Sequence, residues 1–214
     1  MLFKTIPTSQ ISPHVYAVRT RYVNFYIFKD NKFALCFDTG VGESTIKKEM
    51  QKIQIPPEEI THVFLTHSDK DHTGGVKLFS NAMLYISKLE EPLMNGEIKR
   101  SKFMRNSKLG REYETLIDGD FITLGSIEVK AISTPGHTIG SMAYLINHHL
   151  LFVGDTIHLK NNKATTGMNF INMDTRVQQE SLKKIASLKN ISLVCTGHTG
   201  ISKNFNEVMR EWQI

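Results

Sequence analysis

Four short apolar runs, far apart in the chain, each give way to a histidine or aspartate near glycine. The runs with their polar ends read HVFLTHSDKDHTGG, VKAISTPGHTIG, LLFVGDT and SLVCTGHTG. Short apolar runs bounded by turn residues are typical of buried strands. Because a strand end is rigid and the following loop can turn side chains inward, this repetition predicts strand ends that converge at one edge of a sandwich.

The first of these stretches, HSDKDH at residues 67–72, places four metal-ligand types of side chain within six positions. His67 and Asp69 are two residues apart, so in extended chain they point the same way. Asp71 and His72 follow where the backbone turns toward a helix. All four are ligand types for zinc, iron or manganese. The alternative is a solvated polar loop in which Asp71 or Thr73 caps a helix.

The other three stretches each contribute one ligand-type side chain. His137 follows a Pro-Gly turn, Asp155 follows a glycine, and His198 lies between glycines. Four strand ends that all deliver histidine or aspartate beside glycine are hard to produce by chance. We therefore expect a single metal centre that all four strand ends build together.

The order of predicted elements favours a layered α/β sandwich over a single βαβ array, because two strand-rich halves each carry helices. Helices are expected at 43–53 and 175–188, with a helix start at 73–79 and a last helix near 203–212. Strands are expected at VYAVR, NFYIF, FALCF, HVFL, AMLYIS, FITL, IEVKAI, SMAYLI, HLLFVG and ISLVC.

Length and composition suit one domain over residues 1–214. The chain has 214 residues, of which 40% are hydrophobic and 22% charged, and a net charge of +5. These values argue against extended disorder. No apolar run is long enough for a membrane span, and the N-terminus lacks a signal-peptide pattern, so we expect a cytoplasmic protein without a membrane partner. Cys36 and Cys195 are expected to be buried free thiols.

In chain order, the segments FALCFDTG, THSDKDHTGG, STPGHTIGS, FVGDT and CTGHTG resemble the metallo-β-lactamase superfamily. The resemblance extends from about residue 33 to residue 200, and five motifs in the right order are far more specific than any one alone. It implies an α/β fold in four layers, an αββα sandwich, with a metal site at one edge. TPGHTIGS resembles the glyoxalase II-like branch, but residues 201–214 are too few for the C-terminal helical domain of that enzyme.

The superfamily pattern is His-x-His-x-Asp-His, then a histidine, a bridging aspartate and a last histidine. Carried over by position, it implies two divalent cations, with zinc favoured and iron or manganese as alternatives. The implied ligands are His67 and His137 for the first cation, Asp71, His72 and His198 for the second, and Asp155 as the bridge. Asp38, in FDTG, matches a position that is usually structural, and we expect it to support a ligand from behind.

Asp69 stands where the superfamily pattern has its second histidine. Some members, such as the flavodiiron proteins, have glutamate there, so a ligand role for Asp69 stays open. A further carboxylate would make the site more neutral, raise the pKa of bound water and shift preference toward iron or manganese. Either Asp69 binds the first metal directly, or it lies behind the ligands and only one metal is held firmly.

These features favour a metal-dependent hydrolase in which metal-bound hydroxide attacks a carbonyl or phosphorus, with Asp71 orienting the nucleophile. An ester, thioester, lactone or phosphoester of a small molecule would fit. Glutathione thioesters are not expected without the helical domain, and Asp69 and the missing signal peptide disfavour β-lactam antibiotics. The alternative is a diiron redox protein that reduces oxygen or nitric oxide with a separate electron donor.

A polar segment at about 87–115 lies between the second and third motifs. Within it, residues 98–111, IKRSKFMRNSKLGR, hold six basic side chains and no acidic one. Lys99, Lys102 and Arg105 would share one face of a helix. The stretch is either a solvated surface helix or a lid that presents positive charge to an anionic substrate.

Residues 87–115 are too short for the domain that RNA-cutting relatives insert, so no nucleic-acid partner is expected. The sequence leaves the oligomeric state open. His158, three residues after Asp155, is a further histidine that could face substrate. Structural roles are expected for His14, His62, His148 and His149.

Overall fold

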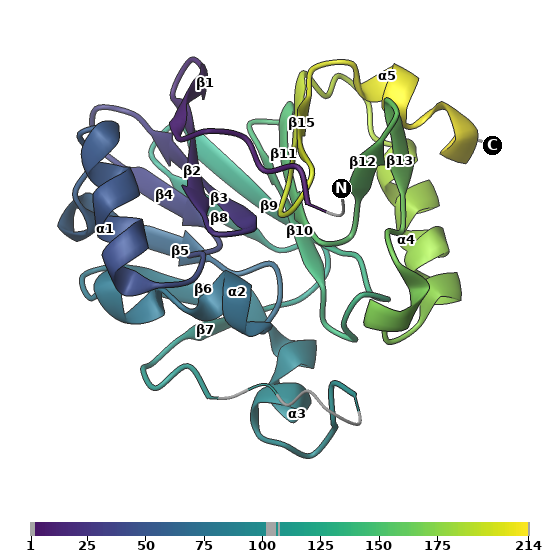
Figure 1. Ribbon diagram of the computed structural model, residues 1–214, viewed down its shortest axis with the longest axis horizontal. Coiled ribbons are helices and arrows are strands. Elements are labelled where there is room, and N and C mark those ends of the chain that lie inside the picture. Colours follow the sequence, from purple (N-terminus) through teal and green to yellow (C-terminus); the bar gives the residue numbers. More distant parts are fainter. Residues whose placement is uncertain (1–2, 102–105, 107, 214) are drawn as a thin grey trace.

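The computed structural model describes residues 3–101, 106 and 108–213. Two β-sheets lie face to face, with α1 on the outer side of one and α4 on the outer side of the other (Figure 1). The four-layer αββα sandwich implied by the resemblance is therefore confirmed. Both cysteines are buried and free, as expected.

The first sheet has seven strands in chain order, and it changes from antiparallel to parallel at β4. The parallel part places the ends of β4, β5 and β6 at the same edge. The strands are β1 (Ser9–Ser12), β2 (Val15–Thr20), β3 (Val23–Lys29), β4 (Ala34–Phe37), β5 (His62–Phe64), β6 (Met83–Ser87) and β7 (Glu114–Leu116).

The second sheet has the order β15-β14-β11-β10-β9-β8, in which β11 and β14 are the parallel pair. A separate hairpin of two strands, β12 (His158–Lys160) and β13 (Lys163–Thr165), lies beyond it. The strands of the sheet are β8 (Phe121–Leu124), β9 (Ile127–Ser133), β10 (Met142–Ile146), β11 (Leu150–Gly154), β14 (Leu193–Thr196) and β15 (Gly200–Ser202).

Two helices longer than two turns cover the sheets: α1 (Glu43–Lys52) and α4 (Thr175–Ala186). The remaining α-helices are single turns: α2 (Lys70–Thr73), α3 (Glu91–Met94) and α5 (Phe205–Val208). Short 3₁₀ turns lie at Pro57–Glu59, Val76–Leu78, Lys88–Glu90, Asn169–Ile171 and Arg210–Trp212. The expected helices at 73–79 and 203–212 are thus broken into short turns.

The central strands β4, β10, β11 and β14 are buried on both faces, which is why they read as continuous apolar runs. In β11, Leu150 and Phe152 pack between the two sheets, whereas Leu151 and Val153 pack under α4 and α5. The inner face holds an aromatic stack in which the rings of Phe37 and Phe152 lie 4.0 Å apart. Side chains that alternate between two apolar layers fix the register, since a slip by one residue would exchange the two faces.

The basic segment 98–111 departs from the helical alternative in its described part. After α3 ends at Met94, the described residues up to Arg111 contain neither helix nor strand. Lys102 and Arg105, which defined the expected helix face, lie outside the described residues. No described helix is long and apolar enough to cross a membrane.

Candidate metal centre

The seven side chains singled out from the sequence meet at one end of the two sheets. His67, Asp155 and His198 follow the parallel strands β5, β11 and β14, and His137 lies in the β9–β10 loop. The ends of these strands and this loop lie at the same end of the two sheets. They fall into groups whose ligand atoms all lie within 4.8 Å of one another. The groups are His67, Asp69 and His137; Asp71, His72 and His198; and His67, His72 and Asp155.

The second subsite consists of Asp71, His72 and His198. Oδ2 of Asp71 lies 3.3 Å from Nε2 of His198 and 3.8 Å from Nε2 of His72. His72 is fully buried, whereas Asp71 is partly exposed. A buried imidazole opposite a partly exposed carboxylate leaves one side of this subsite open to solvent.

The first subsite consists of His67, Asp69 and His137. Oδ2 of Asp69 lies 3.2 Å from Nε2 of His137 and 3.6 Å from Nε2 of His67. All three side chains are buried. The solvated loop considered for HSDKDH is therefore not what forms.

Asp155 lies between the two subsites. Its Oδ2 is 3.0 Å from Nε2 of His198 and 3.6 Å from Nε2 of His137, and its Oδ1 is 3.3 Å from Nε2 of His72. One carboxylate thus faces histidines of both subsites. This is the arrangement that a bridging ligand requires.

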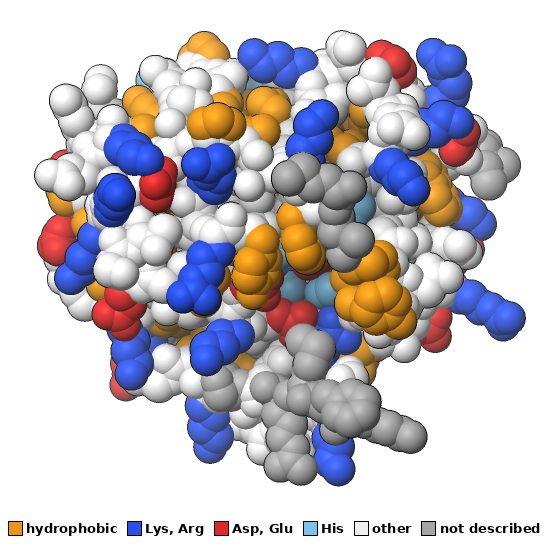
Figure 2. All heavy atoms as spheres, in the orientation of Figure 1, with side chains coloured by type: hydrophobic (Ala, Val, Ile, Leu, Met, Phe, Trp, Pro, Cys, Tyr) orange, Lys and Arg blue, Asp and Glu red, His pale blue; other side chains and the backbone are white. Residues whose placement is uncertain are grey.

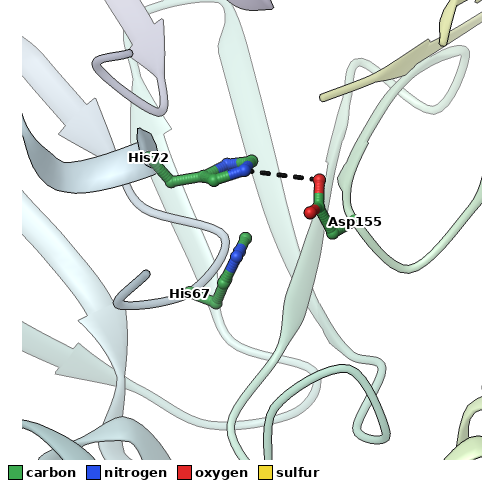
Figure 3. A group of neighbouring side chains, drawn as sticks. All are labelled: His67, His72 and Asp155. Carbon is green, nitrogen blue, oxygen red and sulfur yellow. Dashed lines mark ion pairs between the residues drawn. The ribbon is translucent and has the colours of Figure 1, made fainter. Parts of the chain in front are cut away.

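The donor set fits divalent cations. Among the described residues, Nε2 of His67, Nε2 of His72 and Oδ1 of Asp155 are buried and have no hydrogen-bond partner. Figure 3 shows the three side chains pointing toward one another. Buried polar atoms without partners are costly, so atoms aimed at a common point indicate a site for a cation.

Each histidine is held through its other ring nitrogen. Nδ1 of His72 contacts Oδ2 of Asp38 at 2.8 Å, and Nδ1 of His198 contacts the carbonyl of Tyr22 at 2.8 Å. The hydroxyl of Thr66 and the side-chain oxygen of Asn172 hold the remaining two in the same way. With the Nδ1 proton donated to these oxygens, Nε2 carries the lone pair and faces the centre.

Asp38 supports the centre as expected from FDTG. Its carboxylate accepts hydrogen bonds from the backbone amide and the hydroxyl of Thr66 in addition to the contact with His72. Its backbone has φ of 62°, a conformation that aspartate and asparagine tolerate better than most residues. Asp38 therefore links the end of β4 to the loop that carries the first ligands.

His67 and the two histidines of the second subsite have opposite shifts in pKa. Burial and the neighbouring His72 hold the pKa of His67 well below its usual range. Burial would also lower the pKa of His198, but Asp155 and Asp71 outweigh it and raise that pKa to about 10. His72 also has a raised pKa, because the charges of Asp155 and Asp38 outweigh its burial.

The carboxylates are held ionised despite their burial. Burial would raise the pKa of Asp69, but the contact with His137 and the charges of His67 and Arg100 lower it. In the same way, His198 and His72 hold the pKa of Asp155 well below its usual range. Three negatively charged carboxylates therefore face the centre, counting Asp71, whose pKa is also lowered. Such a centre attracts cations.

Helix α4 supports the loops that carry His137 and Asp155. Gly136 has φ of 132°, and a side chain there would come within 2.4 Å of the backbone of Gln178, so only glycine lets the His137 turn pack on the helix. The side-chain amide of Gln178 donates to the carbonyls of Asp155 and Thr156. One buried side chain thus anchors the loop that follows β11.

Within the segment 87–115, three described residues that contact the centre were not found from the sequence. Arg100 donates to Asp69, and so does Asn106. Glu90 is fully buried and accepts hydrogen bonds from Ser68 and from the third-motif loop at Gly140. A basic stretch was noted at 98–111, but no spacing signal distinguishes Arg100 from its neighbours.

His158 lies beside the second subsite, where the sequence suggested a residue facing substrate. Its ring stacks on that of His198 with centroids 6.0 Å apart, and its Nε2 has no hydrogen-bond partner among the described residues. It also lines a cavity of about 850 Å³ together with Phe3, Lys4 and Lys160. Burial lowers the pKa of His158.

The centre opens to the surface on one face of the molecule. Figure 2 shows histidine and acidic side chains in a recess with hydrophobic side chains beside it. Two exposed aromatic residues adjoin groups that contact the centre. Phe170 is 81% exposed and precedes Ile171, and Tyr22 is 43% exposed and holds His198 through its carbonyl. Exposed aromatic side chains at the rim can bind an apolar part of a ligand.

Comparison with known proteins agrees with this architecture. The family model described as the metallo-beta-lactamase superfamily matches residues 18–198. Among solved structures, the first B3 metallo-beta-lactamase with an active-site glutamic acid aligns with a TM-score of 0.77 at 15% identity, covering 99% of this chain and 87% of that one. A metallo-beta-lactamase family protein of Thermus thermophilus aligns with a TM-score of 0.72 at 18% identity over 94% of this chain and 78% of that one.

Two curated relatives are similar over most of the chain. A probable metallo-hydrolase of Methanocaldococcus jannaschii is 32% identical over 74% of this chain and 66% of its own length. A hydroxyacylglutathione hydrolase of Buchnera aphidicola is 27% identical over 90% of this chain and 67% of its own length. A lactamase-like protein of Aspergillus niger is covered over only 38% of its length. The family match and the shared fold together show that the chain belongs to the metallo-β-lactamase superfamily.

Proposed function

We propose that the chain is a metal-dependent hydrolase that holds divalent cations in two adjoining subsites and cleaves an ester, thioester, lactone or phosphoester of a small molecule. The observation that carries this proposal is the position of Asp155, whose two oxygens face histidines of both subsites. The unpartnered Nε2 and Oδ1 atoms support it further.

In this proposal the side chains divide the work. A divalent cation, when bound, lowers the pKa of water and polarises a substrate oxygen. Asp71 is the most exposed of the ligand side chains at the second subsite, so it can orient an attacking water while it holds a cation. The supports behind the histidines keep each Nε2 aimed at the centre, which limits reorganisation during the reaction.

Thioesters are a reasonable first substrate class. The Buchnera relative is named a hydroxyacylglutathione hydrolase, and a relative in Aspergillus fumigatus that is 26% identical over 88% of this chain is named an ACP thioesterase. The chain spans 54% of that fungal protein, so carrier recognition is not carried over. The exposed aromatic side chains of Phe170 and Tyr22 would suit an acyl group. The positive charge of the basic stretch 98–111 would suit an anionic leaving group.

The test is hydrolysis by chelated protein reloaded separately with zinc, manganese or iron. The panel would contain an acyl thioester, an aryl ester, a lactone and an aryl phosphodiester. We expect one class to be cleaved by the reloaded protein and not by the chelated protein or by Asp155→Ala. Asp30→Asn, which changes an aspartate in the turn between β3 and β4, is the matched control. Equal cleavage with and without metal would contradict the proposal.

The redox alternative rests on the carboxylate at Asp69. It predicts iron in the purified protein and an optical band that bleaches on reduction. Elemental analysis of wild type and Asp69→Ala tests both points. Zinc or manganese that falls from about two per chain toward one in the variant would support hydrolysis with Asp69 as a ligand. Iron with a bleachable band would favour the redox alternative instead.

A further inference from the structure

Arg100 reaches into the first subsite. Its side chain is buried, with 5% of the residue exposed, and its Nε lies 3.0 and 3.2 Å from the two oxygens of Asp69. Its Nη2 lies 3.1 Å from Nε2 of His137 and donates to the carbonyl of Ile171 at 2.7 Å. One guanidinium thus contacts two of the three side chains that form this subsite.

The contact with His137 uses the atom that would bind a metal. Nδ1 of His137 faces the side-chain oxygen of Asn172 at 3.1 Å, and the Asn172 amide nitrogen donates to the carbonyl of Thr166, which fixes the amide orientation. Nδ1 therefore carries the proton and Nε2 the lone pair. In the other tautomer the proton on Nε2 would face the Nη2–H of Arg100, and two donors would oppose each other. A single lone pair can accept from Arg100 or bind a metal, but not both.

The buried carboxylate of Asp69 needs a neighbouring positive charge even when no metal is bound. Asp69 is a buried carboxylate, and an isolated buried charge is strongly unfavourable. Its Oδ2 also lies 3.2 Å from Nε2 of His137, so a positive charge beside both residues stabilises the carboxylate. Arg100 supplies one from within the chain, because its Nε–H contacts both carboxylate oxygens of Asp69 while its Nη2 lies beside His137.

Among the residues that the structure describes, the second subsite has no arginine or lysine in a comparable position. Asp71, His72 and His198 contact one another and Asp155, and two of the histidines are held by Asp38 and the carbonyl of Tyr22. Over residues 3–101, 106 and 108–213, no lysine or arginine hydrogen-bonds or forms an ion pair with these three ligands. A metal that binds the first subsite must therefore displace the guanidinium of Arg100 from His137, whereas no described arginine or lysine has to leave the second subsite.

We propose that Arg100 competes with metal for the first subsite, so that the second subsite loads first and the first loads only when the guanidinium leaves His137. The proposal rests on the metal centre of the proposed function but not on its substrate. It assigns to Arg100 the control of metal stoichiometry, and it pairs the unusual Asp69 with a compensating positive charge.

Titration of the chelated protein with cobalt alone tests this, because cobalt absorption and calorimetry count sites without any assay of activity. Wild type should show one tight and one weaker binding event. In Arg100→Met the weaker event should strengthen by about tenfold or more, because the competing charge-assisted contact is gone, while the tight event stays unchanged. Lys99→Met removes the same charge from the exposed neighbouring side chain and should show the same two cobalt-binding events as wild type.

Arg100→Lys gives a second route if the methionine variant folds poorly. Lysine can pair with Asp69, but its single ammonium lacks the fork that reaches His137 at the same time, so the weaker event should again strengthen. Two equal tight events in wild type, or a second event that weakens in both variants, would overturn the competition and make Arg100 a support for Asp69. No cobalt binding at all would contradict the metal centre itself, whereas normal cobalt binding without hydrolysis would contradict only the proposed function.

Discussion

Oδ2 of Asp38 lies 2.8 Å from Nδ1 of His72, a fully buried ring whose Nε2 faces the second subsite. The contact joins the end of β4 to the ligand-bearing turn of α2. Because it holds the proton on Nδ1, it keeps the lone pair on Nε2. The carboxylate therefore determines which tautomer His72 presents to a metal, although it never contacts the metal position itself.

Asp38→Asn should weaken metal binding by about 10- to 100-fold. An amide nitrogen at Oδ2 would face the proton on Nδ1, and relief of that contact moves the proton to Nε2. Asparagine tolerates the positive φ of this position, so the backbone should keep its conformation. Cobalt titration measures the change.

Asp174→Asn is the control for Asp38→Asn, because it removes one carboxylate charge while asparagine still caps α4. Its cobalt affinity should match that of wild type. An Asp38→Asn protein that is folded and binds cobalt as tightly as wild type would show that the tautomer of His72 does not depend on this contact.

Gly197→Ala should lower metal affinity with little loss of stability. A Cβ at this position would lie 2.5 Å from Oδ1 of Asp155 and 2.8 Å from Cε1 of His72. The carboxylate is the end of a side chain and can turn away, which removes it from the position between the subsites. We expect cobalt affinity to fall by about tenfold or more, in the range seen when supports of metal ligands are disturbed.

The contrasting substitution is Gly136→Ala, where the new Cβ meets the backbone of Gln178 in α4. A backbone cannot turn away, so this variant should lose thermal stability first. If Gly197→Ala instead lowers the melting temperature as much as Gly136→Ala, the tight packing at Gly197 serves the fold and not the position of Asp155.

The motifs predicted the fold and the seven ligand-type residues because strand ends followed by histidine or aspartate leave a local signal. His67 and Asp69 show it in the spacing of two residues, and His137 in its Pro-Gly turn. The placement of Asp155 between the subsites was implied only by the resemblance to the superfamily, and the distance between the subsites depends on how the two sheets pack. No local pattern contains that information.

Arg100, Asn106 and Glu90 could not be predicted for a different reason. They lie in a segment without regular periodicity, and their partners are Asp69 and Ser68, more than twenty residues away in sequence. A basic stretch indicates positive charge but not which arginine is buried. The 3₁₀ turn at Lys88–Glu90 likewise hides a fully buried glutamate behind an ordinary charged sequence.

Glu90→Gln should destabilise the protein by about 2 kcal/mol and also weaken metal binding. One carboxylate oxygen accepts from the amide and hydroxyl of Ser68, and the other from Thr138 and the amide of Gly140. Whichever carboxylate oxygen the amide nitrogen of glutamine replaces, it would face buried N–H and O–H donors, either those of Ser68 or those of Thr138 and Gly140. These bonds join the loop that carries Asp69 to the loop that carries His137. Their loss should therefore let the two side chains of the first subsite move apart.

Denaturant unfolding and cobalt titration give the two measurements for Glu90→Gln. Glu91→Gln, at the next position and partly exposed, is the matched control and should change both by little. A loss of stability with unchanged cobalt binding would mean that Glu90 supports the fold without positioning the two loops.

The metal-free protein should lose stability as pH rises from about 6.5 to about 10, the interval between the ordinary pKa of histidine and that of His198. A group whose pKa is higher in the folded state stabilises it fully below the unfolded value, and that contribution disappears as pH rises through the folded value. His72 acts in the same direction. Asp69 and Asp155 have lowered pKa values, so their contribution is present above about 3.8 and is lost on further acidification.

Melting temperatures of chelated protein across this range test the prediction. The decline above about pH 6.5 should be smaller in His198→Gln and unchanged in His149→Gln, which alters an exposed histidine in the turn between β10 and β11. Metal should reverse the trend, because ligands must be deprotonated to bind it, so the rise in melting temperature caused by cobalt should grow with pH. A melting temperature that stays constant for the chelated protein over this interval would show that Asp155 and Asp71 do not hold a proton on His198.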